Sequence, residues 1–296
     1  MEKRIATPTV TREILADYQI RLSKALGQNF LIDGNIIEKI VNIAEIKSGD
    51  QIIEIGPGIG SLTQALLERI EDGRLFAIEK DERMVRILKE LFQAEQLTLI
   101  HRDVLDIDWP EFFTENALLD KPVKLAANLP YYITTPIIMG LLEARVPVER
   151  YVFMVQKEVA ERMVAKPGGK DYGALSIAVQ YYTRPEICHI VPPSVFIPQP
   201  DVKSAIIKLE TNETPPVQLE DERFFFQIVQ AIFQQRRKNL KNSLSKAANI
   251  RLDRELIEES LQEIGIPEGT RGEMLDLSEI GQLSNILFKG MEDKVN

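Results

Sequence analysis

The stretch Gln51–Ile70, "QIIEIGPGIGSLTQALLERI", carries the pattern that decides the fold. Its first five residues are mostly isoleucine, which is typical of a strand buried on both faces of a parallel sheet. Alternate glycines, Gly56, Gly58 and Gly60, follow the strand, and Leu62–Ile70 then repeats apolar residues at helical spacing. A buried strand, a glycine-rich turn and a helix form the first half of a βαβ unit, so this stretch predicts an α/β fold.

The same alternation of strand and helix continues on both sides of this stretch. Apolar runs of strand length occur at 51–55, 75–78, 97–101, 124–127 and 151–155, and helical periodicity occurs at 36–44, 62–70, 84–92, 136–142 and 156–164. Nearly all-apolar strands that alternate with helices predict a parallel sheet covered on both faces. Two further runs, 186–191 and 205–209, have no long helix between them and predict an antiparallel hairpin at one edge of a seven-stranded sheet.

A second region begins after Thr211–Val217, "TNETPPV", where paired prolines and polar residues indicate a linker. No strand pattern returns after this linker, and apolar residues at helical spacing predict three to five helices. We therefore expect an α/β domain over residues 1–210 and a small all-helical C-terminal domain over residues 218–296.

Composition narrows the class of protein. The 296 residues include one cysteine, Cys188, so no disulfide framework is expected, and neither it nor the two histidines, His101 and His189, has the neighbours of a metal site. No apolar run reaches the length of about eighteen residues that indicates a membrane span. The start, "MEKRIATPTV", lacks the apolar core of a signal peptide. We expect a cytoplasmic protein that works as a monomer and without a metal ion.

One segment is basic although the formal net charge of the chain is −9. From Arg223 to Arg251 there are seven basic residues and no acidic residue. Such a run is usually a solvated helix face, but a local cluster can bind phosphates because charges act over a Debye length of ~8–10 Å. The segment favours RNA contact, with these candidates: Arg236, Arg237, Lys238 and Lys241.

The turn after the first strand is the candidate cofactor site. Gly56 and Gly58 let the backbone approach a ligand closely. Glu79 ends the second strand about twenty residues further on, where a carboxylate can accept both hydroxyls of a ribose, and Asp103 ends the third strand, where it could accept from an adenine amino group. Either acid alone could be a turn residue on the rim, but together they favour a nucleoside site. The Gly-x-Gly-x-Gly spacing weakens a dinucleotide reading, and the absence of a lysine after the turn fits a nucleoside without phosphates.

The fourth strand ends in an unusual sequence, "NLPYY", that begins at Asn128. The residue before a proline is pushed toward extended geometry, which turns the Leu129 carbonyl toward the ligand crevice. Asn128 offers an amide oxygen and Tyr131 a flat face. Two acceptors and a ring suit an amino group on an aromatic base. The alternative, a buried turn with Tyr131 in the core, would leave Asn128 in need of a partner that the local sequence does not offer.

The whole chain resembles the bacterial ribosomal RNA adenine dimethyltransferases of the KsgA/RsmA family. The motifs that carry the resemblance are "KALGQNFL" (Lys24–Leu31), "EIGPGIGSLT" (Glu54–Thr63), "NLPY" (Asn128–Tyr131), "VPPSVFIPQPDVKSAIIKL" (Val191–Leu209) and "FQQRRKNLKNSL" (Phe233–Leu244). The resemblance implies the class I methyltransferase fold, a Rossmann-like sheet that is mostly parallel, with S-adenosylmethionine as cofactor. It implies dimethylation at N6 of two adjacent adenosines in the 3′-terminal hairpin loop of small-subunit ribosomal RNA, within 30S biogenesis.

The resemblance also implies roles for individual residues. Those implied to contact the cofactor are Gln28, Asn29, Leu31, Gly56, Gly58, Glu79, Asp103 and Asn128. Those implied to hold the target adenine are Asn128, Leu129, Pro130 and Tyr131, with Phe196 stacking on the other face of the base. Two alternatives remain open: a resistance-type methyltransferase for large-subunit RNA, which would share the fold, and an assembly factor that recognises an immature subunit and uses the fold mainly as a scaffold.

Overall fold

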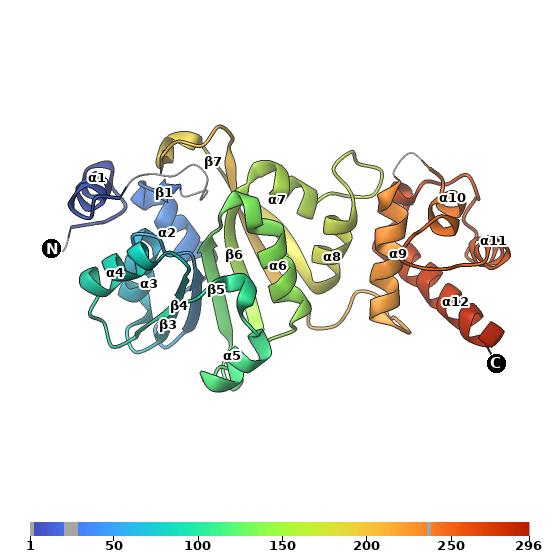
Figure 1. Ribbon diagram of the computed structural model, residues 1–296, viewed down its shortest axis with the longest axis horizontal. Helices are drawn as coiled ribbons and strands as arrows, with labels where there is room; N and C mark the ends of the chain where they lie inside the picture. The colour runs from blue at the N-terminus through green and yellow to red at the C-terminus, as the bar shows by residue number, and fades with distance from the viewer. Residues whose placement is uncertain (1–2, 21–28, 236–237, 296) are drawn as a thin grey trace. The chain divides into compact units, whose positions relative to one another are not determined.

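The computed structural model describes residues 3–20, 29–235 and 238–295 (Figure 1). Contacts divide the chain into two compact units, residues 1–160 with 185–211 and residues 161–184 with 212–296. The division differs from the expected boundary because the segment 161–184 belongs with the C-terminal helices.

A mixed sheet forms the centre of the first unit. Within the described residues its strands run in the order β4-β3-β2-β5-β6-β9-β7. Their bounds are β2 Gln51–Ile55, β3 Arg74–Glu79, β4 Leu97–His101, β5 Val123–Asn128, β6 Val148–Gln156, β7 Thr183–Val191 and β9 Ser204–Thr211. The five strands from β4 to β6 are parallel neighbours, and β9 runs antiparallel to β6. This confirms the expected seven-stranded, mostly parallel sheet with an antiparallel edge.

The first unit also contains helices, several of which cover the sheet (Figure 1). They are α1 Pro8–Asp17, α2 Gly34–Ile43, α3 Ser61–Ile70, α4 Glu82–Leu91, α5 Trp109–Glu115, α6 Thr134–Glu143 and α7 Lys157–Met163, whose last residues cross into the second unit. Ile40 of α2 and Leu66 of α3 are fully buried in one cluster with Ile52 and Val152 of the sheet. Apolar strands therefore have apolar helix faces against them, as the sequence pattern requires.

A second, very small sheet lies outside the main one. β1, Phe30–Leu31, pairs antiparallel with β8, Phe196–Ile197. The register places Phe30 opposite Ile197 and Leu31 opposite Phe196. Strands of two residues are too short to produce a pattern in the sequence, so neither was expected.

The second unit is helical in its described part. It contains α8 Ala174–Tyr182, α9 Glu222–Gln234, α10 Leu240–Ser245, α11 Arg254–Glu263 and α12 Leu277–Val295. Its core joins Tyr181 of α8 with Phe225 and Ile228 of α9, and with Leu261 and Leu283 from the last two helices. The expected helical C-terminal region is confirmed. Among the described residues, no helix has both the length and the apolar character needed to cross a membrane.

Candidate active site

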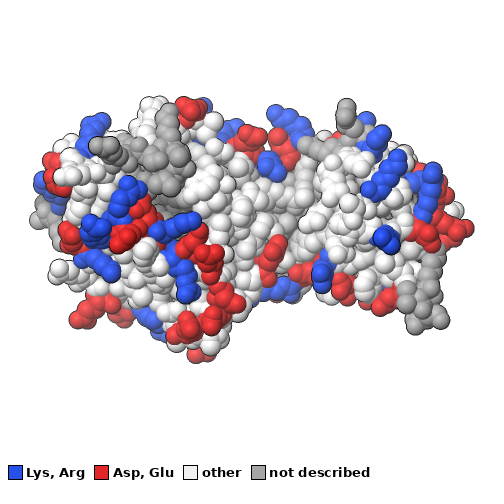
Figure 2. Space-filling view, in the orientation of Figure 1, with Lys and Arg blue, Asp and Glu red and all other residues white. Residues whose placement is uncertain are grey.

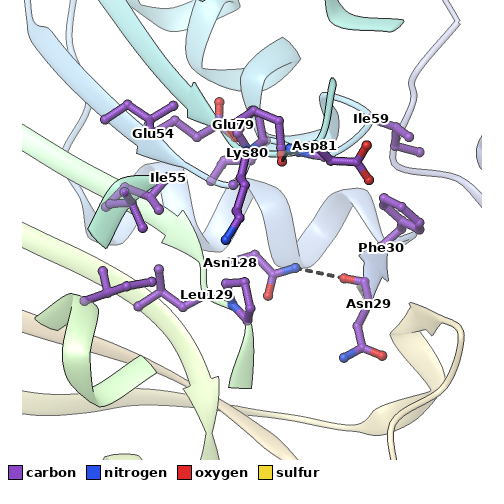
Figure 3. Close-up of a pocket in the computed structure, with 18 of the residues that line it drawn as sticks. Asn29, Phe30, Glu54, Ile55, Ile59, Glu79, Lys80, Asp81, Asn128 and Leu129 are labelled. Atoms are coloured by element: carbon purple, nitrogen blue, oxygen red, sulfur yellow. Dashed lines mark hydrogen bonds between the residues drawn. The ribbon is translucent and has the colours of Figure 1, made fainter. Parts of the chain in front are cut away.

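A cavity of about 420 Å³ opens at the carboxyl ends of β2, β3 and β5 (Figure 3). All the residues that line it belong to the first unit. Ligands of open α/β sheets bind at this end of the strands, because the loops there diverge and leave a crevice. The strand ends selected from the sequence therefore lie around one common space.

The glycine-rich turn forms one wall of the cavity. Gly56 has φ +66°, a conformation that L side chains rarely adopt, and a Cβ placed on it would meet no atom within 4 Å. A Cβ on Gly58, at φ +59°, would lie 3.2 Å from the Phe30 ring. Because Gly56 and Gly58 carry no side chain, a ligand could approach the backbone closely at these two positions.

Glu79, the last residue of β3, is fixed by two backbone donors. Its Oε2 accepts from the Gly58 N–H at 3.1 Å and its Oε1 from the Asp81 N–H at 2.8 Å. Burial raises the pKa of this carboxyl above its usual value, against those two hydrogen bonds. Each carboxylate oxygen keeps a second lone pair, so the group can still accept from two ligand hydroxyls.

Glu54 is a second buried carboxyl on the same wall, and its place in the sequence indicated no role for it. It lines the cavity from β2 and accepts from the Thr63 hydroxyl at 2.7 Å. Burial raises the pKa of Glu54 to about 8, the Thr63 bond opposes this rise, and the charge of Glu79 adds to it. At neutral pH this carboxyl is therefore mostly protonated, and the cavity wall carries less negative charge than its two glutamates suggest.

Replacing this carboxyl should remove a pH dependence of stability. Because the folded-state pKa of Glu54, about 8, lies above the ordinary value of 4.5, ionisation disfavours folding as pH rises through that window. We expect Glu54→Gln to match the wild type in free energy of unfolding near pH 4.5 and to exceed it by a few kcal/mol, on the order of 1.4 kcal/mol per pKa unit, at pH 8. Urea unfolding across this range measures the difference. Glu68→Gln, an exposed carboxyl on α3, is the control and should leave the pH profile parallel to that of the wild type.

Asp103, at the end of β4, already has a partner inside the chain. Lys80 Nζ donates to its Oδ2 at 2.5 Å, and the Leu105 N–H donates to its Oδ1 at 3.1 Å. The hydrogen bond from Lys80 lowers the pKa of this carboxyl below its usual value. Lys80 itself lines the cavity and extends across it in Figure 3. A ligand amino group that uses Asp103 must therefore share the carboxylate with Lys80 or displace it.

Asn128, the last residue of β5, has a defined amide orientation. Its Nδ2 donates to the main-chain oxygen of Asn29 at 3.0 Å, the dashed line in Figure 3. A carbonyl can only accept, so the amide nitrogen must be the atom on that side and Oδ1 must be the other. Asn29 comes from the segment before β1. The sequence selected both residues separately and did not indicate that one orients the other.

The next three residues continue the wall. Leu129, Pro130 and Tyr131 all line the cavity. The Leu129 N–H donates to the Met154 carbonyl at 3.1 Å, and the Tyr131 hydroxyl is 2.6 Å from Ser204 Oγ on β9. Burial raises the pKa of Tyr131, so it remains a neutral ring at physiological pH. The hydroxyl contact fixes the ring in the wall of the cavity.

One residue that the resemblance implies for the target base is not among the residues that line this cavity. Phe196 is 2% exposed, lies in the core cluster and does not line the cavity, because β8 pairs it with Leu31. Leu31 itself lines the cavity. Gln28, Arg236 and Arg237 lie outside the described residues.

The two remaining basic candidates differ in their surroundings. Lys238 is exposed. Lys241 has a side chain that is 14% exposed, and its ammonium lies 2.5 Å from Glu258 and 2.9 Å from Glu268. The acid-free run in the sequence hid these partners, because they follow the run and reach Lys241 only through folding. On the face shown in Figure 2, the described Lys and Arg side chains over the C-terminal helices stand apart from one another.

The lining residues fit S-adenosylmethionine. Its ribose hydroxyls need a carboxylate such as Glu79, and its methionine part needs a close backbone approach such as the open side of Gly56.

No group of three or more His, Cys, Asp or Glu side chains among the described residues lies close enough together to hold a metal ion.

The sheet topology and the position of the cavity place the chain among the class I methyltransferases. The sequence model of one family within this class, "Ribosomal RNA adenine dimethylase", matches residues 20–281. The chain belongs to this family.

Relatives at high identity cover nearly the whole chain. It is 54% identical over 289 residues to "Ribosomal RNA small subunit methyltransferase A" of Halothermothrix orenii, covering 97% of this chain and 95% of that protein. Proteins of the same name from Alkaliphilus oremlandii and Bacillus pumilus are 50% and 48% identical, covering 97% and 98% of this chain and 99% and 100% of their own length.

Solved structures agree with the assignment. The dimethyladenosine transferase of Plasmodium falciparum matches with a TM-score of 0.73 at 26% identity, over 90% of this chain and 98% of that one. The 23S rRNA methyltransferase ErmE matches with a TM-score of 0.64 at 24% identity, over 88% of this chain and all of that one. At that identity the second match shows the common fold only.

Proposed function

We propose that the protein dimethylates N6 of two adjacent adenosines in the 3′-terminal hairpin loop of small-subunit ribosomal RNA, with S-adenosylmethionine as methyl donor. The observation that carries this proposal is the orientation of Asn128, whose Oδ1 is left available because Nδ2 is used on Asn29. Family membership and the names of the relatives support the choice of substrate. A substrate within the ribosomal subunit supports a cytoplasmic location for the protein.

The residues that would hold the cofactor lie on the strand ends described above. Glu79 would accept the ribose hydroxyls, Gly56 and Gly58 would allow close backbone approach, and Asp103 would accept from the adenine amino group. When bound, S-adenosylmethionine supplies an electrophilic methyl group on a sulfonium.

The target amine would be held by acceptors from the fourth-strand motif. Asn128 Oδ1 would accept one N–H of the exocyclic amine, with the Leu129 carbonyl as the second acceptor. Each accepted N–H directs the nitrogen lone pair toward the donor methyl, and the Tyr131 ring would lie against the base. The amine loses its proton readily only after methylation, so positioning can provide most of the acceleration, on the order of 7–11 kcal/mol for well-oriented pairs.

Methylation assays separate this proposal from the resistance-type alternative. Purified protein with labelled S-adenosylmethionine should methylate 30S particles from cells that lack the modification, and nucleoside analysis by mass spectrometry should find N6,N6-dimethyladenosine at two adjacent positions. Naked 23S RNA should remain unlabelled. Labelling of 23S RNA alone would replace this proposal with the alternative.

A role in subunit assembly can be tested with the same protein. Asn128→Ala should bind unmethylated 30S particles as the wild type does. If a strain carrying only this variant assembles 30S subunits normally and lacks the modification, recognition of the immature subunit needs binding and not chemistry. If the strain that carries only Asn128→Ala instead shows the same 30S assembly defect as a strain without the gene, the function in assembly is methyl transfer alone.

The basic segment should contribute to RNA affinity through charge. Replacing Arg236, Arg237 and Lys238 together by alanine should weaken binding to 30S particles and reduce the slope of log K against log salt by about 2 to 3, since each phosphate contact contributes about 0.9. Lys241→Ala is the comparison, and we expect a smaller change because two glutamates already neutralise Lys241. An unchanged salt slope in the triple variant would contradict the assignment.

A further inference from the structure

The mouth of the cavity carries an aromatic side chain that none of the roles above uses. Tyr132 is one of the lining residues, yet it is 60% exposed. A single exposed aromatic is ordinary on a protein surface. Its position is informative here, because it directly follows the motif that would hold the target base and stands at the opening through which RNA would enter.

The two neighbouring tyrosines differ in how they are fixed. The Tyr131 hydroxyl contacts Ser204 Oγ at 2.6 Å. The Tyr132 side chain, by contrast, is exposed. Tyr131–Ile133 form a 3₁₀ turn, in which consecutive side chains point about 120° apart. The two side chains therefore leave the turn in different directions, and Tyr132 is the more exposed of the two.

A cation lines the same cavity as this ring. Lys80 lines the same cavity, and 69% of its side chain is exposed. Its hydrogen bond to Asp103 chiefly raises the pKa of Lys80, and the nearby Tyr132 hydroxyl adds a smaller contribution. An exposed aromatic ring and a lysine on the rim of one cavity suit an unpaired nucleotide, whose base can stack on the ring while its phosphate approaches the lysine.

We propose that Tyr132 is a stacking platform for the nucleotide next to the adenosine being methylated. The inference rests on the proposed function, in which two adjacent adenosines are modified. While one adenine occupies the cavity, its neighbour stacks on Tyr132, and the two exchange places between rounds. Tyr132 is thus a substrate-positioning residue that reads the presence of a second unpaired base.

The test compares Tyr132→Ala and Tyr132→Phe on two kinds of 30S particle, one with intact RNA and one whose RNA lacks the base beside a single target adenosine. On intact particles we expect Tyr132→Ala to lower kcat/KM about tenfold, within the range of stacking contributions at 1.4 kcal/mol per tenfold. Tyr132→Phe, which keeps the ring, should stay within about twofold. Removing the neighbouring base should lower the wild type to the level of Tyr132→Ala and leave that variant unchanged.

Two controls keep the outcome specific. Leu119→Ala removes another exposed apolar side chain, 54% exposed and outside the cavity lining, and should behave as the wild type on both particles. The Kd for S-adenosylmethionine should be the same in all variants. The proposed stacking role would be wrong if Tyr132→Ala methylates intact particles at the wild-type rate. It would also be wrong if removing the neighbouring base lowers kcat/KM of Tyr132→Ala by the same factor as that of the wild type. Failure of the wild type to methylate intact particles would instead overturn the proposed function.

Discussion

Asn128→Ala is expected to lose methyl transfer almost completely while keeping most of its affinity for S-adenosylmethionine. The side chain supplies the acceptor whose direction the chain itself fixes through Asn29, and loss of one such preoriented group lowers kcat by roughly 10²- to 10³-fold. Single-turnover methylation of unmethylated 30S particles measures the chemical step, and isothermal titration with the cofactor measures binding.

The orientation itself is tested by Asn128→Asp. Aspartate keeps the acceptor atoms but cannot donate to the Asn29 carbonyl, so we expect it to lose most of the activity as well. Asn116→Ala is the matched control, because Asn116 Nδ2 makes a similar bond to the Phe112 carbonyl at 2.8 Å and lies outside the cavity lining. Full activity in Asn128→Asp would mean that the hydrogen bond to Asn29 is not needed to orient the acceptor oxygen of residue 128.

Glu79→Ala should have the second largest effect, and on cofactor binding. Hydrogen bonds to a charged acceptor contribute about 1.5–3 kcal/mol each, so losing those to a ribose should raise the Kd for S-adenosylmethionine by about 100-fold. Glu79→Gln should also bind weakly, since its amide nitrogen would face the N–H of Gly58 or of Asp81. Isothermal titration gives both Kd values.

Binding to 30S particles separates a cofactor role for Glu79 from a general defect. We expect the Kd for unmethylated particles, measured without cofactor at fixed salt, to stay within about twofold of the wild-type value in both variants. A parallel loss of affinity for cofactor and for particles, together with a lower midpoint of thermal unfolding, would assign Glu79 to the stability of the fold.

Elements of the fold that have a periodic pattern in their own sequence could be predicted, and elements without such a pattern could not. The strands of the parallel sheet are apolar runs because both faces are covered, and β2 is buried along its whole length. Helix α8, "ALSIAVQYY", was missed because most of its residues are buried and it therefore lacks the polar face that reveals a helical period. The two-residue strands β1 and β8 exist only as a pair and have no local pattern at all.

The sequence indicated which residues stand at the strand ends, but not which other residues they contact. Glu79, Asp103 and Asn128 stand at the ends of parallel strands, and such ends meet at one edge of a sheet. The contacts of Asp103 with Lys80 and of Asn128 with Asn29 join residues far apart in the sequence. The burial of Phe196 likewise depends on pairing with β1. Residue types and spacing do not encode such tertiary contacts.

The pairing of β1 with β8 has a consequence for how the chain can be shortened. Phe30 pairs with Ile197 and Leu31 pairs with Phe196. The Ile32 N–H donates to the Val195 carbonyl at 2.9 Å. Deleting the residues before Asp33 would therefore remove more than one wall of a pocket. It would also remove the strand that pairs with residues 195–197 and the Asn29 carbonyl that orients the Asn128 amide. An N-terminal truncation would therefore affect both the cavity wall and the orientation of Asn128.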